Sequence, residues 1–140
     1  MLFREKIHWV TLFTMIVAFG WYFINYPWQV VDMKAGVWAT GAMLLVTAIG
    51  IIIVMTVATA FFAIRAPGEA HLKEDERDRV IHSRGTHLAY YPLVIGVWVN
   101  LGAAFYGLSQ AGQINLLLAT VVLAELVRIG SQIYLYRRGY

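Results

Sequence analysis

The sequence contains no cysteine, and few of its 140 residues are charged or proline. The absence of cysteine excludes disulfides, thiolate metal sites and thiol redox chemistry. Charged residues make up 14% of the chain, whereas soluble domains carry about 25%. Hydrophobic residues make up 60%, and the mean hydropathy is +0.65. This composition indicates an integral membrane protein.

Charge is also absent from two long internal stretches, 35–64 and 85–124. Each stretch exceeds the ~20 residues that cross the hydrocarbon core of a bilayer. We expect an all-α fold, a four-transmembrane-helix bundle forming a single membrane domain over 1–140. Hydropathy places the four helices at about 9–26, 36–64, 88–108 and 114–136. The first apolar run continues through Trp21 without a small-residue cleavage site, so we expect an uncleaved helix and not a signal peptide.

Basic residues are distributed unequally between the two sides of this arrangement. Of the 11 Lys and Arg residues, Lys34 alone falls on the outer side. The positive-inside rule therefore predicts that both termini and the charged segment 65–87 are cytoplasmic. Acidic and basic residues balance within 65–84, so the segment offers no cationic patch and we expect no nucleic-acid partner.

The charged segment combines helix-forming residues with opposite charges one turn apart, such as Glu74 and Arg77, and therefore predicts a cytoplasmic helix. Two imidazoles and two carboxylates fall within about 60° of one another on that helix. They are His71, Asp75, Asp78 and His82. These side chains suit a divalent metal, but His71 and His82 are roughly 16 Å apart. A metal site would therefore use Asp78 and His82 with further ligands from another helix or subunit. The alternative to metal binding is that the four side chains are solvated and form ion pairs with nearby arginines. No other cofactor is expected.

The same polar stripe continues into the third apolar stretch if one helix runs through both. It then passes along small or polar residues, namely Gly85, Ala89, Gly96, Asn100 and Gly107. Small residues let membrane helices pack closely, so we expect this face to point into the bundle while Trp98, Leu101 and Phe105 point away. A kink at Pro92 is the alternative, because it would rotate the two halves out of register.

Two charged residues interrupt the fourth apolar stretch, Glu125 and Arg128. Each costs about 2.5 to 3.5 kcal/mol at the bilayer centre, so we expect both to face protein or water. Counting residues from the cytoplasmic ends puts Asn100 at nearly the depth of Glu125. We predict a buried Asn100, Glu125 and Arg128 cluster, which either stabilises the bundle or a dimer, or moves ions, protons or a polar substrate.

A short motif precedes the third apolar stretch. Its residues are Asp75, Glu76, Arg77, Asp78 and Ile81, followed by Tyr90 and Tyr91. This pattern resembles a family of small uncharacterised bacterial inner-membrane proteins that have four helices and a DERD-x-x-I signature before the third. The resemblance implies the same topology in the bacterial cytoplasmic membrane. It also implies a small helix-turn-helix regulator, encoded by a neighbouring gene, as a cytoplasmic partner.

The sequence favours a protein that is not an enzyme. It shows no arrangement of Ser, His and acid for nucleophilic catalysis, and its histidines lie too near the cytoplasmic boundary for a bis-histidine haem. The leading hypothesis is a membrane interaction or regulatory protein whose charged helix contacts a partner. The alternatives are an ion, metal or small-solute binding or transport protein using Glu125 and the stripe, or an enzyme of lipid metabolism. The small-residue face also allows a homodimer.

Overall fold

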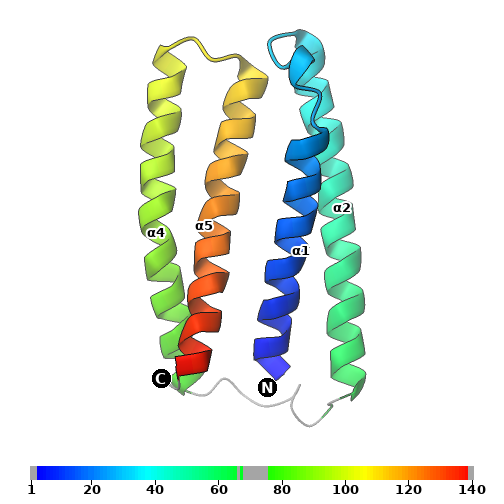
Figure 1. Cartoon of the computed structure of the whole chain (residues 1–140), viewed down its shortest axis with the longest axis vertical. Coiled ribbons are helices and arrows are strands. Elements are labelled where there is room, and N and C mark those ends of the chain that lie inside the picture. The colour runs from blue at the N-terminus through cyan, green and yellow to red at the C-terminus, as the bar shows by residue number, and fades with distance from the viewer. Residues whose placement is uncertain (1–2, 66, 68–75, 139–140) are drawn as a thin grey trace.

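The computed structural model describes residues 3–65, 67 and 76–138, and these form a helical bundle without strands. Its elements are α1 (Phe3–Asn25), the short 3-10 turn η1 (Trp28–Val30), α2 (Lys34–Arg65), α4 (Glu76–Phe105) and α5 (Gln110–Arg138). The long helices lie side by side and alternate in direction (Figure 1). Both ends of the described chain lie at one end of the bundle, here named the terminal end. The α1–α2 and α4–α5 connections lie at the opposite, turn end.

Each of the four long helices is long and apolar enough to cross a membrane. Their outward faces carry large apolar side chains that are more than half exposed, among them Phe13, Ile24, Trp38, Ile64, Trp98 and Phe105. Soluble monomers rarely expose large contiguous apolar surfaces. The expected all-α fold with four helices of membrane length is therefore confirmed.

Proline sets the first turn. Because a residue before proline avoids the helical conformation, α1 ends at Asn25, two positions before Pro27. The turn is fastened by the Tyr26 hydroxyl, which lies 3.2 Å from the Gly36 carbonyl oxygen. Gly36 is buried, and a Cβ there would overlap the backbone of Val30 and Val31. Because Gly36 has no side chain, the first turn of α2 can pack closely against the backbone of Val30 and Val31.

Glycine and serine set the second turn. Gly107 has a φ of +75°, and Leu108 N–H donates to the Ala103 carbonyl at 3.3 Å, the pattern of a glycine-terminated helix. Ser109 then caps α5 by accepting from Gly112 N–H at 3.2 Å. Its hydroxyl also donates to the Val31 carbonyl at 2.9 Å, which joins the two turns. The third helix therefore ends before the expected position 108, and the fourth begins before 114.

The described part of the charged segment that begins at Glu76 forms one helix with the third apolar stretch. α4 starts at Glu76, twelve residues before the expected boundary at 88, and continues past Pro92 to Phe105. Its buried residues are Ile81, Gly85, Ala89 and Asn100. The predicted inward stripe is therefore present at Gly85, Ala89 and Asn100, on both sides of Pro92. The prediction was wrong for Gly107, which is exposed and lies in the turn after α4 because that turn needs its positive φ. Trp98, Leu101 and Phe105 are exposed, as expected.

Helix α5 holds the bundle together. It packs along α4 on one side and along α1 on the other, and it meets α2 less extensively. Most of the buried core belongs to it, including Val122, Ala124, Ile129, Ile133 and Leu135. The bundle therefore consists of two hairpins, α1–α2 and α4–α5, joined through α5.

Candidate functional site

Buried polar groups at the turn end link three helices. The Tyr22 hydroxyl donates to Asn115 Oδ1 at 2.8 Å. Asn115 Nδ2 donates to Thr40 Oγ1 at 3.3 Å, and that oxygen is 2.8 Å from the Tyr26 hydroxyl. All four side chains are buried. Their polar atoms satisfy one another, so this turn-end network is structural.

A second buried polar contact joins α4 and α5, nearer the turn end than the terminal end. Asn100 Nδ2 donates to the Gly96 carbonyl at 2.9 Å and to Thr120 Oγ1 at 3.2 Å. Gln113 Nε2 donates to the Asn100 backbone carbonyl at 3.1 Å. Asn100 is therefore buried, as predicted, but its partner on α5 is Thr120.

The structure does not assemble the predicted Asn100, Glu125 and Arg128 cluster. Arg128 pairs with Glu125 on its own helix, with Nη2 to Oε2 at 2.6 Å, and both side chains are about one-third exposed. Thr120 and Glu125 are five residues apart, which corresponds to about 140° around the helix axis. A side chain that faces Thr120 therefore cannot face Glu125. The Glu125–Arg128 pair forms without Asn100.

A cavity of about 250 Å³ opens where α1, α4 and α5 meet at the terminal end. Its polar lining consists of His8, Asp78, His82, Gln132 and Tyr136, completed by Ile7 and Ile81. We name it the terminal-end cavity. Two of the sequence-predicted metal residues, Asp78 and His82, contribute to it from successive turns of α4.

Hydrogen bonds order the cavity walls. The Tyr136 hydroxyl donates to Asp78 Oδ1 at 2.7 Å, and the His8 ring lies 5.6 Å from the Tyr136 ring, centroid to centroid. Gln132 Nε2 is 3.3 Å from His82 Nδ1.

Gln132 occupies this position because α4 has glycine opposite it. A Cβ at Gly85 would lie 2.5 Å from Gln132 Cγ and 3.2 Å from the Arg128 carbonyl oxygen. Gln132 is 1% exposed, and its Oε1 is buried without a hydrogen-bond partner among the described residues. A buried acceptor left unpaired costs about 1 to 3 kcal/mol.

The metal hypothesis receives limited geometric support. His71 and Asp75 lie outside the described residues. Within the described part of the chain, no three His, Asp or Glu side chains lie close enough together to hold one ion. Structural metal sites usually have four protein ligands, and catalytic zinc sites three.

Most of the other described residues of the predicted signature are exposed on α4. Glu76, Arg77, Tyr90 and Tyr91 are exposed, whereas Ile81 is 1% exposed and packs inward. The signature therefore combines an inward anchor, a cavity carboxylate in Asp78 and an outward charged surface. Its first residue, Asp75, is outside the described residues.

Sequence reasoning missed three polar cavity residues, His8, Gln132 and Tyr136. Gln132 carried a usable signal, because it is a polar side chain in an apolar stretch, one turn beyond Arg128. Tyr136 lies a further turn along the same face. His8 carried no such signal, because its contact with α4 and α5 depends on how the hairpins pack.

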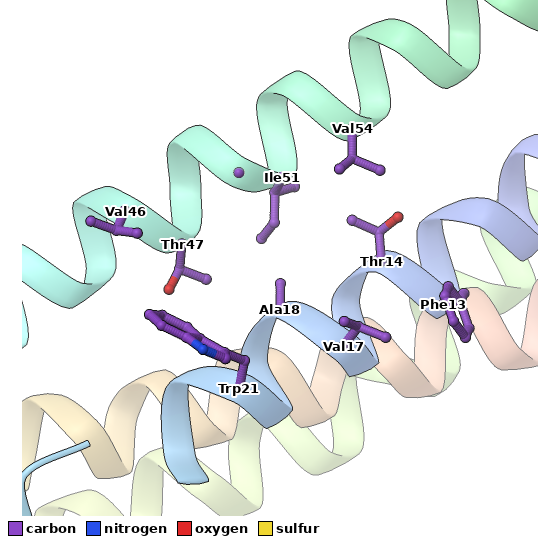
Figure 2. Close-up of a pocket in the computed structure, with 10 residues that line it drawn as sticks. Phe13, Thr14, Val17, Ala18, Trp21, Val46, Thr47, Ile51 and Val54 are labelled. Carbon is purple, nitrogen blue, oxygen red and sulfur yellow. The ribbon is translucent and has the colours of Figure 1, made fainter. Parts of the chain in front are cut away.

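An apolar groove of about 430 Å³ separates α1 from α2 (Figure 2). Thr14, Ala18 and Trp21 face Thr47 and Ile51 across it. The groove has little polar lining and belongs to the part of the bundle that is long and apolar enough to lie in a membrane. It therefore offers mainly apolar contact.

The fold and site define a helical bundle with four candidate membrane spans and a polar cavity at its terminal end. Comparison with known proteins found no matching family model, no matching curated protein and no matching solved structure.

Proposed function

We propose that the chain is a non-enzymatic interaction protein of the bacterial cytoplasmic membrane, with its terminal end in the cytoplasm. Four helices of membrane length and the concentration of Lys and Arg at the terminal end support this orientation. The α4 extension would then project from the membrane surface. It would present a charged face to a soluble partner.

The observation that carries the proposal is the asymmetry of the first three turns of α4. Ile81 and Gly85 are buried on the side that faces α5, which fixes the helix in place. The opposite side exposes Glu76, Arg79 and Ser83 to solvent. An immobilised helix whose outer face carries both charges loses little conformational entropy on binding, so it suits recognition of a protein surface with the complementary charge pattern.

The partner we propose is the small helix-turn-helix regulator implied by the sequence resemblance. Binding would place the regulator at the membrane through a protein contact, because the charged segment has no net cationic character toward nucleic acid. A change in the bundle would then change the amount of regulator held at the membrane.

Charge reversal at Arg79 tests this proposal. The full-length protein in nanodiscs is titrated with the purified regulator, and binding is measured by interferometry. Arg79→Glu should weaken binding at least tenfold, because it replaces attraction by repulsion at the contact. Lys34→Glu makes the same charge change at the turn end and should leave affinity unchanged. Absence of binding by the unaltered protein, or equal losses in both variants, would contradict the proposal.

Ion transport through Glu125 draws less support. Two hydrogen bonds from Arg128, at 2.6 and 2.9 Å, neutralise Glu125 within its own helix. The turn-end network lies farther along the bundle and involves hydroxyl and amide groups. The Glu125–Arg128 pair is better explained as a local ion pair that lowers the cost of both charges.

A further inference from the structure

The groove between α1 and α2 has the size and composition of a small-molecule site. Its volume of about 430 Å³ lies within the ~300 to 1,000 Å³ of ligand pockets, which are mostly apolar and carry a few polar groups. The described residues that line it include Phe13, Trp21 and Val54, and none of them is charged. A molecule that fits this groove would therefore be neutral and rich in hydrocarbon.

Thr14 supplies the groove with a hydroxyl that has no partner. Other threonine hydroxyls donate to the carbonyl oxygen four residues earlier, at 2.8 to 3.0 Å, in Thr11, Thr40, Thr47, Thr86 and Thr120. The Thr14 side chain is 8% exposed, yet its hydroxyl makes no hydrogen bond within the described part of the chain. Figure 2 shows this side chain projecting from α1 into the groove, toward α2.

The unpaired hydroxyl indicates which group of a ligand would be recognised. A hydroxyl buried among apolar groups without a partner is destabilising, whereas a valine of nearly the same shape would have no polar atom there. Thr47 also lines the groove, but its hydrogen is already donated to the Met43 carbonyl. The hydrogen of Thr14 is available to a neutral acceptor, such as a carbonyl oxygen.

The space is maintained because α1 and α2 are joined on both sides of it. Toward the terminal end, Thr11 Oγ1 lies 3.7 Å from Met55 Sδ. At the turn end, the Tyr26 hydroxyl is 2.8 Å from Thr40 Oγ1. Between these contacts, a Cβ on Gly50 would meet no atom within 4 Å. The groove cannot close without loss of one of the two contacts.

The depth of Thr14 narrows the class of ligand. Thr14 is the midpoint of α1, which spans Phe3–Asn25, so it lies about 16 Å from each end of the helix. The hydrocarbon core of a bilayer is ~30 Å thick. In the membrane location proposed above, the hydroxyl is therefore near the bilayer centre, beyond the reach of phospholipid headgroups. The ligand must be dissolved in the hydrocarbon layer.

We propose that the α1–α2 groove binds a neutral, hydrocarbon-rich carbonyl compound that is dissolved in the membrane. Its carbonyl oxygen would accept the hydrogen of Thr14, and its apolar arms would lie along Ala18 and Gly50. The Trp21 ring lies beneath Thr47 in Figure 2 and would cover one end of the ligand. The proposal rests on the membrane location of the chain and does not involve the regulator.

The compounds 7-tridecanone and tridecane provide a matched pair of probes, because they have the same chain length and differ in one central carbonyl. The full-length protein is placed in nanodiscs, and its Tm is followed as the mole fraction of each probe in the lipid is raised. The ketone should raise the Tm by several degrees, and the alkane should raise it much less.

Thr14→Val tests the hydroxyl. It should reduce the response to 7-tridecanone to that of tridecane, without lowering the Tm of the unliganded protein, because no hydrogen bond within the described chain is lost. Thr59→Val is the matched control. It removes an exposed hydroxyl of α2 outside the groove and should leave the response unaltered.

Ala18→Leu tests the space. The larger side chain would fill the middle of the groove and should abolish the response to 7-tridecanone. Ala48→Leu adds the same atoms to an exposed position of α2 that does not line the groove, and it should keep the response.

Three results would overturn this proposal. An equal response to ketone and alkane would show that the groove takes hydrocarbon alone, as it would a lipid chain. A full response to the ketone in Thr14→Val would exclude the hydroxyl from recognition, and no response to either probe would exclude the site. The regulator does not enter these measurements, so a negative result would leave the partner proposed for α4 untouched.

Discussion

The two hairpins of the bundle use glycine in opposite ways. In the α4–α5 hairpin, a Cβ at Gly96 would overlap the side chain of Thr120, and one at Gly85 would meet Gln132. In the α1–α2 hairpin, a Cβ at Gly20, Gly41 or Gly50 would have no atom within 4 Å. At these positions glycine therefore allows close contact between α4 and α5 and leaves open space along α1 and α2. Gly36 contacts the turn before α2 and not the facing helix, and Gly102 and Gly130 also have open space.

This difference has an energetic consequence if the bundle lies in a bilayer. Lipid tails are as apolar as the side chains, so helices associate through close packing and hydrogen bonds and not through the hydrophobic effect. The α4–α5 hairpin has both, whereas α1 and α2 are separated over part of their length by the groove of Figure 2. We expect α4–α5 to be the more stable unit, with the turn-end network holding α1 and α2 against it.

The largest effect is expected from Gly96→Ala. The new Cβ would lie 2.8 Å from Thr120 Cβ, so the helices must separate and the free energy of unfolding should fall by about 1 to 3 kcal/mol. Reversible unfolding in mixed micelles with increasing SDS measures this quantity. Gly50→Ala is the control and should change it by less than about 0.5 kcal/mol, within the range of surface substitutions. Equal losses at the two positions would refute the contrast between the hairpins.

A smaller effect is expected where the hairpins join. Asn115→Ala removes the acceptor for Tyr22 and a donor to Thr40, leaving buried polar groups unpaired, and should lower the free energy of unfolding by about 1 to 2 kcal/mol. Asn25→Ala, where the exposed amide bonds within its own helix, is the matched control. The same SDS titration compares them, and a neutral Asn115→Ala would show that the turn-end network does not hold the hairpins together.

Tyr22→Phe tests one hydrogen bond of the turn-end network, because it removes the hydroxyl and keeps the ring. Hydrogen bonds between membrane helices contribute about 0.6 kcal/mol on average, and we expect a loss of that size. The Asn115 side chain keeps its bonds to Thr40 and Ala111. A loss as large as that of Asn115→Ala would indicate that the bond to Tyr22 accounts for the whole network.

The smallest effect is expected in the groove. Ala18→Leu adds three carbons to a groove of about 430 Å³, so the free energy of unfolding should change by less than about 0.5 kcal/mol. Ala89→Leu on the buried face of α4 adds the same atoms to a packed contact and should be destabilising by about 1 to 3 kcal/mol. If both variants unfold alike, the groove is closed in the folded protein.

Much of the architecture was predictable because it depends on local sequence. Hydropathy located four helices, and the spacing of Gly85, Ala89 and Asn100 identified the buried face of α4. The helix boundaries were less accurate, because charged residues continue a helix as readily as apolar ones. α4 therefore starts at Glu76 and not at the edge of the apolar stretch.

The candidate site was predicted in part. Asp78 and His82 were selected from their one-turn spacing, and both line the terminal-end cavity. The pairing of Asn100 with Glu125 was wrong because depth along a helix was counted but rotation about its axis was not. Asn100 meets Thr120 instead.

The sequence by itself determined the number of helices, their apolar lengths and the inward face of α4, since these follow from hydropathy and from a period of about 3.6 residues. Only the tertiary structure decided which helices touch. It brought His8 of α1 to Asp78 and Gln132, which lie far away in the chain. The physical reason is that the rotation of each helix about its axis, and the helix it packs against, depend on how complete helix surfaces fit together. Gly96 against Thr120 and Gly85 against Gln132 are examples. The local sequence of one helix does not contain this information.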